Sequence, residues 1–179
     1  INASLLQPLP VQDAKQLMSL FTTDTKNPGN LPTSHLNFID YRDQSEAFSG
    51  ILAYTGAGLS LTKGETNEPV FALVVSGNYF DVLGVKANLG RAFLPEEETP
   101  GKHRVVVLSD GLWHSRYGAD PALVGKNIRV DGEDFTVIGI MPPEFEFQFW
   151  SGPRQLWVPI IYTEGDKDRG SHSFLSLAR

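Results

Sequence analysis

The sequence predicts a mixed α+β fold, and three observations lead to that class. Short runs of β-branched and aromatic residues between glycines and prolines predict several strands. Two segments run from a strand through a serine into a short amphipathic turn that ends at glycine, which is typical of short helices. The pair Asp131-Gly132 between alternating apolar residues predicts a β-hairpin. A chain of 179 residues can bury a sizeable core without disulfides or a metal.

The N-terminal quarter predicts an arm, a strand, a loop and a helix in that order. A Pro-x-Pro pattern favours an extended arm over residues 1–14. Partial alternation of polarity predicts a strand over residues 15–23, and residues 24–32 are rich in residues that break regular structure. A short helix is expected over residues 34–45, with a threonine or a serine as its N-cap.

Extended structure is expected next. Apolar residues separated by small ones over residues 47–63 predict a strand that is interrupted near Gly56 and Gly58. Residues 68–76 predict a second strand, and its continuous apolar run favours burial on both faces.

The two strand–helix segments cover residues 74–84 and 107–118. Their similarity fits a duplicated unit, and it fits equally the shared physics of any strand that runs into a short helix. Trp113 and Tyr117 lie four residues apart on the second helix, so we expect both to anchor it to the core.

The hairpin is expected over residues 126–141. With the Asp-Gly pair as its loop, Val130 pairs with Glu133, and Arg129 lies opposite Asp134. This register places four apolar side chains together on one face: Ile128, Val130, Phe135 and Val137.

The C-terminal part begins with an aromatic stretch, Phe145 to Trp150. Its alternation fits packing on the core, and the alternatives are contact with a partner or with a carbohydrate or lipid. A short strand over residues 156–158, a charged loop over 164–169 and a last strand over 173–178 complete the prediction.

Composition excludes several classes of function. The chain has 15 Lys and Arg against 21 Asp and Glu, a net charge of −6, and no basic stripe, which argues against a nucleic-acid partner. It has no cysteine, which excludes thiol catalysis and iron–sulfur clusters. Its longest purely apolar run, Val70 to Val75, is far too short to span a bilayer. The first residue is Ile1, so the chain is interpreted as an excised fragment.

No catalytic template fits the sequence. A Gly-x-Ser-x-Gly nucleophile elbow and a Walker loop are both absent. Gly56-Ala57-Gly58 lacks the third glycine and the helix of a dinucleotide site, and it predicts a strand bend or bulge. We therefore expect no enzyme activity, no cofactor and no catalytic residues.

No metal site is expected either. The histidines form no close pair in the sequence: His35, His103, His114 and His172. Glu96-Glu97-Glu98 is interpreted as a solvated turn, and the alternative is a loose divalent-ion site with His103. Single substitutions of these glutamates are expected to leave folding intact.

The segment Ser-Gly-Asn-Tyr-Phe-Asp-Val-Leu-Gly-Val at residues 76–85, followed by Leu-Gly-Arg-Ala-Phe at residues 89–93, resembles a stretch of MacB-like periplasmic core domains. Residues 105–118, 120–126 and 137–143 are similar to the next blocks of that family. Residues 5–10 resemble the arm that follows the first membrane helix of such permeases. The resemblance thus covers nearly the whole chain in order.

The resemblance implies a domain inserted between the first two transmembrane helices of an ABC-transporter permease of the FtsX or MacB type, on the periplasmic face of the cytoplasmic membrane. A cytoplasmic ATPase subunit would hydrolyse ATP, and the domain would relay that motion and dock a periplasmic adaptor or substrate protein in export or efflux. The resemblance also allows a homodimer in the full-length protein.

The family's architecture implies two lobes. Residues 1–75 plus 166–179 would form a strand–helix–strand lobe joined to the membrane, and residues 76–165 an inserted smaller α+β lobe that contains the hairpin. Family members continue past a segment like residues 175–179, so the core domain is expected to be C-terminally incomplete within residues 1–179.

Two alternatives remain open. A secreted hydrolase, or a secreted carbohydrate- or small-molecule-binding module, would use the Phe145 to Trp150 stretch, and its tryptophan fluorescence would respond to glycans. A sensory ectodomain would be stabilised thermally by its ligand. Apolar runs of about 20 residues on either side of the chain in its gene would favour the permease instead.

Overall fold

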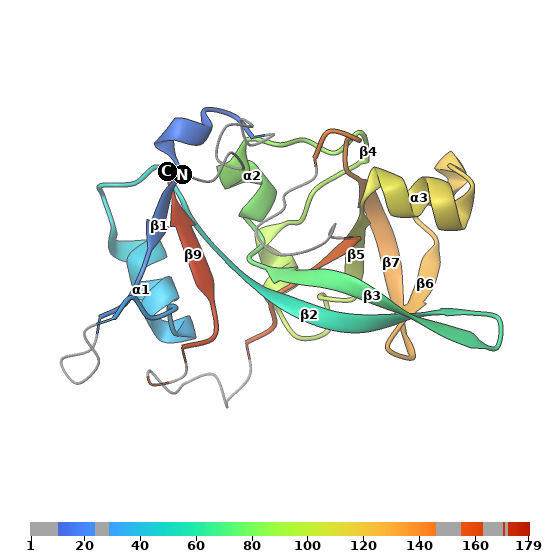
Figure 1. The fold of residues 1–179 in the computed structure, drawn as a ribbon, viewed down its shortest axis with the longest axis horizontal. Coiled ribbons are helices and arrows are strands. Elements are labelled where there is room, and N and C mark those ends of the chain that lie inside the picture. Colours follow the sequence, from blue (N-terminus) through green and yellow to red (C-terminus); the bar gives the residue numbers. More distant parts are fainter. Residues whose placement is uncertain (1–10, 24–28, 146–154, 163–169, 171) are drawn as a thin grey trace.

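The computed structural model describes residues 11–23, 29–145, 155–162, 170 and 172–179. Within these residues, nine strands form one mixed sheet and three short α-helices pack against it (Figure 1). The strands are β1 (Met18–Leu20), β2 (Ile51–Lys63), β3 (Thr66–Val75), β4 (Leu89–Gly90), β5 (Val105–Leu108), β6 (Asn127–Val130), β7 (Glu133–Ile140), β8 (Leu156–Pro159) and β9 (Leu175–Ala178). The α-helices are α1 (His35–Gln44), α2 (Tyr79–Leu83) and α3 (Asp110–Tyr117), and the 3₁₀ turns are η2 (Ala14–Gln16), η3 (Pro95–Glu98) and η4 (Pro121–Leu123). The predicted α+β class is confirmed.

The strand order is β1-β9-β2-β3-β8-β5-β7-β4. Strand β6 pairs with both β2 and β7, so six strands (β2, β3, β8, β5, β7 and β6) close into a ring. We call β1, β9 and α1 the α1 end of the molecule, and β5, β6, β7 and α3 the ring end. Figure 1 shows β2 and β3 running between these two ends.

The helix predicted over residues 34–45 is α1. Its N-cap is Ser34, whose hydroxyl accepts a hydrogen bond from the Asn37 N–H at 3.3 Å. The strand predicted over residues 15–23 is confirmed only at β1. The chain enters β1 through η2, because the Gln16 N–H bonds back to the Asp13 carbonyl at 2.8 Å and closes a 3₁₀ turn. The arm over residues 1–10 and the loop over residues 24–28 lie outside the described residues.

Strand β2 passes through Gly56 and Gly58 without a break, so the predicted interruption is wrong. Gly56 pairs with Leu73 and Gly58 with Phe71 in one continuous antiparallel ladder with β3. The ladder continues through both glycines because the residues on either side of each one are also paired with β3. Burial of β3 on both faces was expected throughout, but Phe71 is 57% exposed, and the first four residues of the strand, Thr66 to Pro69, are exposed as well.

Each predicted strand–helix segment contains a short helix that ends at a glycine in the left-handed region. Strand β3 leads into α2, which ends at Gly84 with φ 69°. Strand β5 leads into α3, which ends at Gly118 with φ 62°. Glycine accepts this backbone conformation without the cost that a Cβ would add, so the sequence marked both helix ends correctly.

The hairpin of β6 and β7 has the predicted register. Val130 pairs with Glu133, and Arg129 lies opposite Asp134 with Nε and Oδ1 3.7 Å apart. Asp131 and Gly132 both have positive φ, as a type I′ turn requires. The Asp131 carboxylate also accepts a hydrogen bond from the Ser60 N–H at 2.6 Å, which ties the turn to β2.

The core consists of three apolar clusters. One lies under α1, a second fills the ring against α3, and the third surrounds α2 between the two ends. Trp113 is 8% exposed and Tyr117 packs against the ring cluster, as predicted. The division into a lobe of residues 1–75 plus 166–179 and an insert of residues 76–165 stays a prediction. Among the described residues, no helix has the length and apolar character needed to cross a membrane.

Candidate functional site

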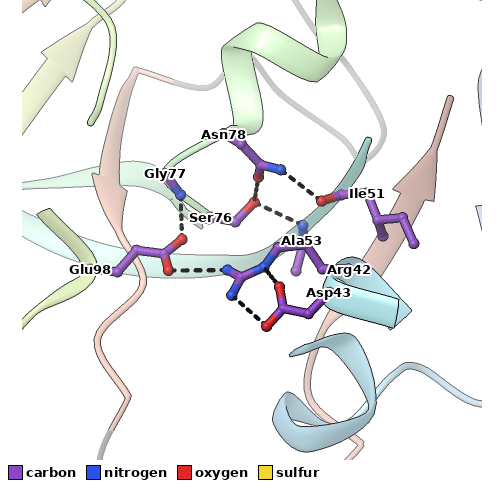
Figure 2. Close-up of polar contacts among 8 residues, drawn as sticks. All are labelled: Arg42, Asp43, Ile51, Ala53, Ser76, Gly77, Asn78 and Glu98. Atoms are coloured by element: carbon purple, nitrogen blue, oxygen red, sulfur yellow. Dashed lines mark hydrogen bonds and ion pairs between the residues drawn. The ribbon is translucent and has the colours of Figure 1, made fainter. Parts of the chain in front are cut away.

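The turn between β3 and α2 is tied to β2 by a buried polar network (Figure 2). The Ser76 hydroxyl accepts a hydrogen bond from the Ala53 N–H at 3.0 Å and donates one to Asn78 Oδ1 at 2.7 Å. The Asn78 amide in turn donates to the Ile51 carbonyl at 2.9 Å. Ser76 is fully buried, so these bonds replace water that its hydroxyl has lost.

A second set of contacts joins the same turn to η3 and α1. The Gly77 N–H donates to Glu98 Oε1 at 2.6 Å, and Glu98 Oε2 lies 3.5 Å from the Arg42 guanidinium. Arg42 also donates to the neighbouring Asp43 at 2.8 Å. That hydrogen bond raises the pKa of the Arg42 guanidinium and lowers the pKa of the Asp43 carboxyl. We call the eight residues of Figure 2 the α2 junction: Arg42, Asp43, Ile51, Ala53, Ser76, Gly77, Asn78 and Glu98.

The other end of α2 is tied to segments near both ends of the described chain. The Gln12 N–H donates to the Leu83 carbonyl at 3.1 Å, and Arg179 Nε donates to the Val82 carbonyl at 2.8 Å. Helix α2 is therefore held at its start by β2, α1 and η3, and at its end by residues beside β1 and β9.

The helix itself carries an aromatic cluster. The fully buried Phe80 ring contacts four other aromatic rings with centroids 5.2–5.8 Å away: Tyr79, Phe93, Phe145 and Trp157. Such edge and tilted contacts fix the orientation of a helix because each ring accepts few alternative positions. Movement of α2 would therefore also displace β8, the strand that carries Trp157.

The glutamates of η3 are not all solvated, and the prediction is corrected here. Glu97 is 5% exposed, pairs with Arg91 at 2.7 Å and 3.1 Å, and accepts a hydrogen bond from the Leu94 N–H. Glu98 belongs to the α2 junction, and only Glu96 has the expected exposed position. A buried carboxylate with a charged partner is costly to unpair, so substitution of Glu97 should destabilise the fold.

The described residues include no group of three or more histidine, aspartate and glutamate side chains arranged to hold a metal. The imidazole of His103 accepts from the Gly101 N–H, His114 lies beside Asp110 on α3, and His172 contacts the Pro32 carbonyl. His35 is buried and stacks on Tyr162 with ring centroids 3.5 Å apart. The four histidines therefore lie in four separate local environments.

Phe145, the first residue of the aromatic stretch, packs in the core at 3% exposure. The rest of that stretch lies outside the described residues. Two of the cavities in the described part of the chain lie close to the elements described above. One of about 250 Å³ adjoins the α2 junction and is lined by Ser49, Gly50, Asn78, Asp81, Val82 and Arg179. The other, of about 240 Å³, lies beside β1 and β9.

The sequence pattern of a strand, a serine and a short helix gives Ser76 and Asn78 no role beyond the start of α2. The structure uses both to reach β2, and neither caps the helix through its side chain. The sequence does contain a sign of this second role. Ser76 and Asn78 both favour the N-cap position, but a helix has only one N-cap. The second polar side chain therefore needed another partner.

Comparison with known proteins identifies a protein family and several structures of similar fold. The chain matches the family described as MacB-like periplasmic core domain over residues 7–177. No curated protein matches it.

Three solved structures have a similar fold. They are the extracellular domain of the noncanonic ABC-type transporter YknZ from Gram-positive bacteria (TM-score 0.64, 13% identity, covering 92% of this chain and 83% of that one), the periplasmic region of MacB from Actinobacillus actinomycetemcomitans (0.61, 16%, 90% and 73%) and a domain of a putative permease protein from Porphyromonas gingivalis (0.60, 15%, 83% and 68%). At these identities, the similarity shows that the fold is shared.

Proposed function

The chain belongs to the MacB-like periplasmic core domain family, and from this premise we propose that it relays ATP-driven movement within an export or efflux permease. As a member of this family, it is a periplasmic domain of an ABC-transporter permease. In our proposal, movement of the transmembrane helices enters the domain on the outer face of the cytoplasmic membrane. The domain then passes that movement from its α1 end to its ring end.

The observation that carries the proposal is the composition of the α2 junction. Arg42, Ile51 and Ala53 come from the proposed first lobe, whereas Ser76 and Glu98 come from the proposed insert. Buried hydrogen bonds resist shear because an unpaired donor or acceptor pays its full desolvation cost. The α2 junction therefore supports transmission of movement between the two parts.

The remaining parts of the proposal follow from the family. A cytoplasmic ATPase partner hydrolyses ATP, and this domain catalyses no reaction itself. Its outer surface docks an adaptor or substrate protein. Five exposed apolar side chains are the positions at which a photo-crosslinking residue would test docking: Met18, Phe21, Tyr41, Phe71 and Leu94.

The relay is tested in the full-length permease, reconstituted with its ATPase in liposomes that contain a quencher lipid. This chain has no cysteine, so Gln44→Cys on α1 and Ser115→Cys on α3 each give one labelling site within it. Both positions are exposed. Fluorescence of each label then reports its distance from the membrane, with and without ATP.

We expect ATP to change the quenching of both labels, and a non-hydrolysed ATP analogue to stop each in a single state. A response at Gln44→Cys alone would mean that movement ends at the α1 end. ATP hydrolysis without a response at either label would mean that the domain takes no part in the cycle. Either result would contradict the relay.

A further inference from the structure

Two adjacent glutamates on η3 form ion pairs of different strength, each with its own arginine. Glu97 makes two contacts with Arg91, at 2.7 Å and 3.1 Å, and its side chain is 7% exposed. Glu98 makes one contact with Arg42, at 3.5 Å, which is the outer limit of a hydrogen bond. The Arg91 pair is thus a fixed part of the fold, whereas the Arg42 pair is weak.

Arg42 has a second carboxylate beside it. Asp43 accepts from Arg42 Nε at 2.8 Å and from Nη2 at 3.5 Å, so it holds the guanidinium more closely than Glu98 does. Asp43 lies on the same helix as Arg42 and moves with it, whereas Glu98 lies on η3. The guanidinium also lies over the Phe38 ring, 5.5 Å from its centroid, which favours the cation in either arrangement.

Opening of the Arg42–Glu98 contact would leave neither charge without a partner. Arg42 would keep Asp43, whose side chain is 53% exposed and remains solvated. Glu98 would keep the Gly77 N–H at 2.6 Å, a charge-assisted hydrogen bond that is strong in itself. Two arrangements of similar free energy are the requirement for a conformational switch.

We propose that the Arg42–Glu98 ion pair is a latch between α1 and the β3–α2 turn, and that Asp43 is the competing partner that lets it open. In the closed arrangement, Arg42 bridges to Glu98 and α1 follows the turn. In the open arrangement, Arg42 belongs to Asp43 alone and α1 moves separately. This inference adds a conformational switch to the proposed relay, and the function of that switch rests on the relay.

The competition makes a prediction with a definite sign. If Asp43 competes for Arg42, Asp43→Asn removes the competitor and closes the latch. If Asp43 instead orients Arg42 towards Glu98 within a static network, the same substitution loosens the Arg42–Glu98 contact. The Gly77 amide reports either outcome. Glu98 releases the Gly77 N–H less often when Arg42 also holds it than when Gly77 is its single partner, and neither Gly77 nor Glu98 is altered.

The experiment is hydrogen exchange of the Gly77 amide, followed by NMR in this chain. We expect Asp43→Asn to slow exchange of the Gly77 amide by about 2- to 5-fold, the factor that a weak ion pair supplies, and Arg42→Gln to accelerate it by a similar factor. Glu46→Gln removes the same charge from the exposed chain just after α1 and should change nothing. The Val107 amide in the buried strand β5 should exchange more slowly than the Gly77 amide in every variant, which shows that each variant keeps the fold.

Faster or unchanged exchange at Gly77 in Asp43→Asn would overturn the latch. That result would leave the relay standing, because a static junction transmits movement as well. A failure of the liposome experiment would remove the relay and leave the latch as a property of the chain alone. The two proposals can therefore fail separately.

Discussion

The β3–α2 unit and the β5–α3 unit follow the same local pattern, yet the fold uses them differently. Ser109 caps α3 by accepting from the Leu112 N–H three residues ahead, and Gly118 ends the helix in open space. Ser76 reaches across to Ala53 of β2, and Gly84 ends α2 against Gln12. In the β3–α2 unit, distant segments hold both ends of the helix, whereas in the β5–α3 unit the cap is local and the glycine stop has no neighbour.

The difference separates what neighbouring residues determine from what distant ones determine. A helix start and a glycine stop need only residues within one turn, so both units fold alike locally. Their roles depend on segments far away in the sequence. Substitutions at equivalent places in the two units should therefore have unequal effects.

The largest effect is expected in the helix interiors. Phe80→Ala removes a ring that four aromatic rings surround, and it should lower the free energy of unfolding by about 4 kcal/mol. Leu112→Ala on α3, where the side chain is 5% exposed, should cost about 2–3 kcal/mol. Urea unfolding followed by far-UV circular dichroism measures both values. Equal losses would mean that α2 is no more central than α3.

The glycine stops give the next comparison. An alanine Cβ at Gly84 would lie 2.6 Å from Gln12 Cβ, and the left-handed backbone would be strained as well. Gly84→Ala should cost roughly 2–3 kcal/mol. At Gly118 the backbone is the same but no atom lies within 4 Å, so Gly118→Ala should cost about 1 kcal/mol. Thermal unfolding of the two variants measures both losses of stability. The difference between them shows how strongly Gln12 restricts the end of α2.

The two serines should differ by less. Ser76→Ala leaves the buried Ala53 N–H without its acceptor and should cost about 2 kcal/mol. Ser109→Ala removes a helix cap and should cost about 1 kcal/mol. Denaturant midpoints at an unchanged slope measure both. A larger loss in Ser109→Ala would reverse the comparison.

A pH measurement examines the β5–α3 unit alone and has the smallest expected effect. Burial raises the pKa of the Tyr117 phenol, because the folded state disfavours the phenolate. Its contribution to stability is therefore complete below about pH 10, the unfolded value, and is lost as the pH rises above it. Wild type should lose stability relative to Tyr117→Phe in that range. Parallel stability curves for the two proteins would contradict this.

Much of the fold is predictable because its signals are local. The register of β6 and β7 follows from two turn residues and the alternation beside them, and α1 follows from Ser34 and the apolar residues after it. The sequence does not predict the continuity of β2, because glycine destabilises an isolated strand. In the structure, β3 pairs with the residues on both sides of Gly56 and keeps the strand continuous.

The α2 junction was missed for the same reason. Ser76 and Ala53 are adjacent only after β2 and β3 have paired, and nothing in the local pattern distinguishes Ser76 from Ser109. The burial of Glu97 likewise depends on Arg91 and on the cover supplied by the fold. Sequence patterns located the polar residues but could not assign their partners.

The central claim is that the α2 junction couples the α1 end to the ring end. The most direct test is the liposome experiment with the Ser115→Cys label, repeated in the Ser76→Ala and Ser109→Ala backgrounds. We predict that ATP hydrolysis continues in both, that the label on α3 loses its ATP response with Ser76→Ala, and that it keeps the response with Ser109→Ala. An unchanged response with Ser76→Ala, or equal losses in both backgrounds, would contradict the account.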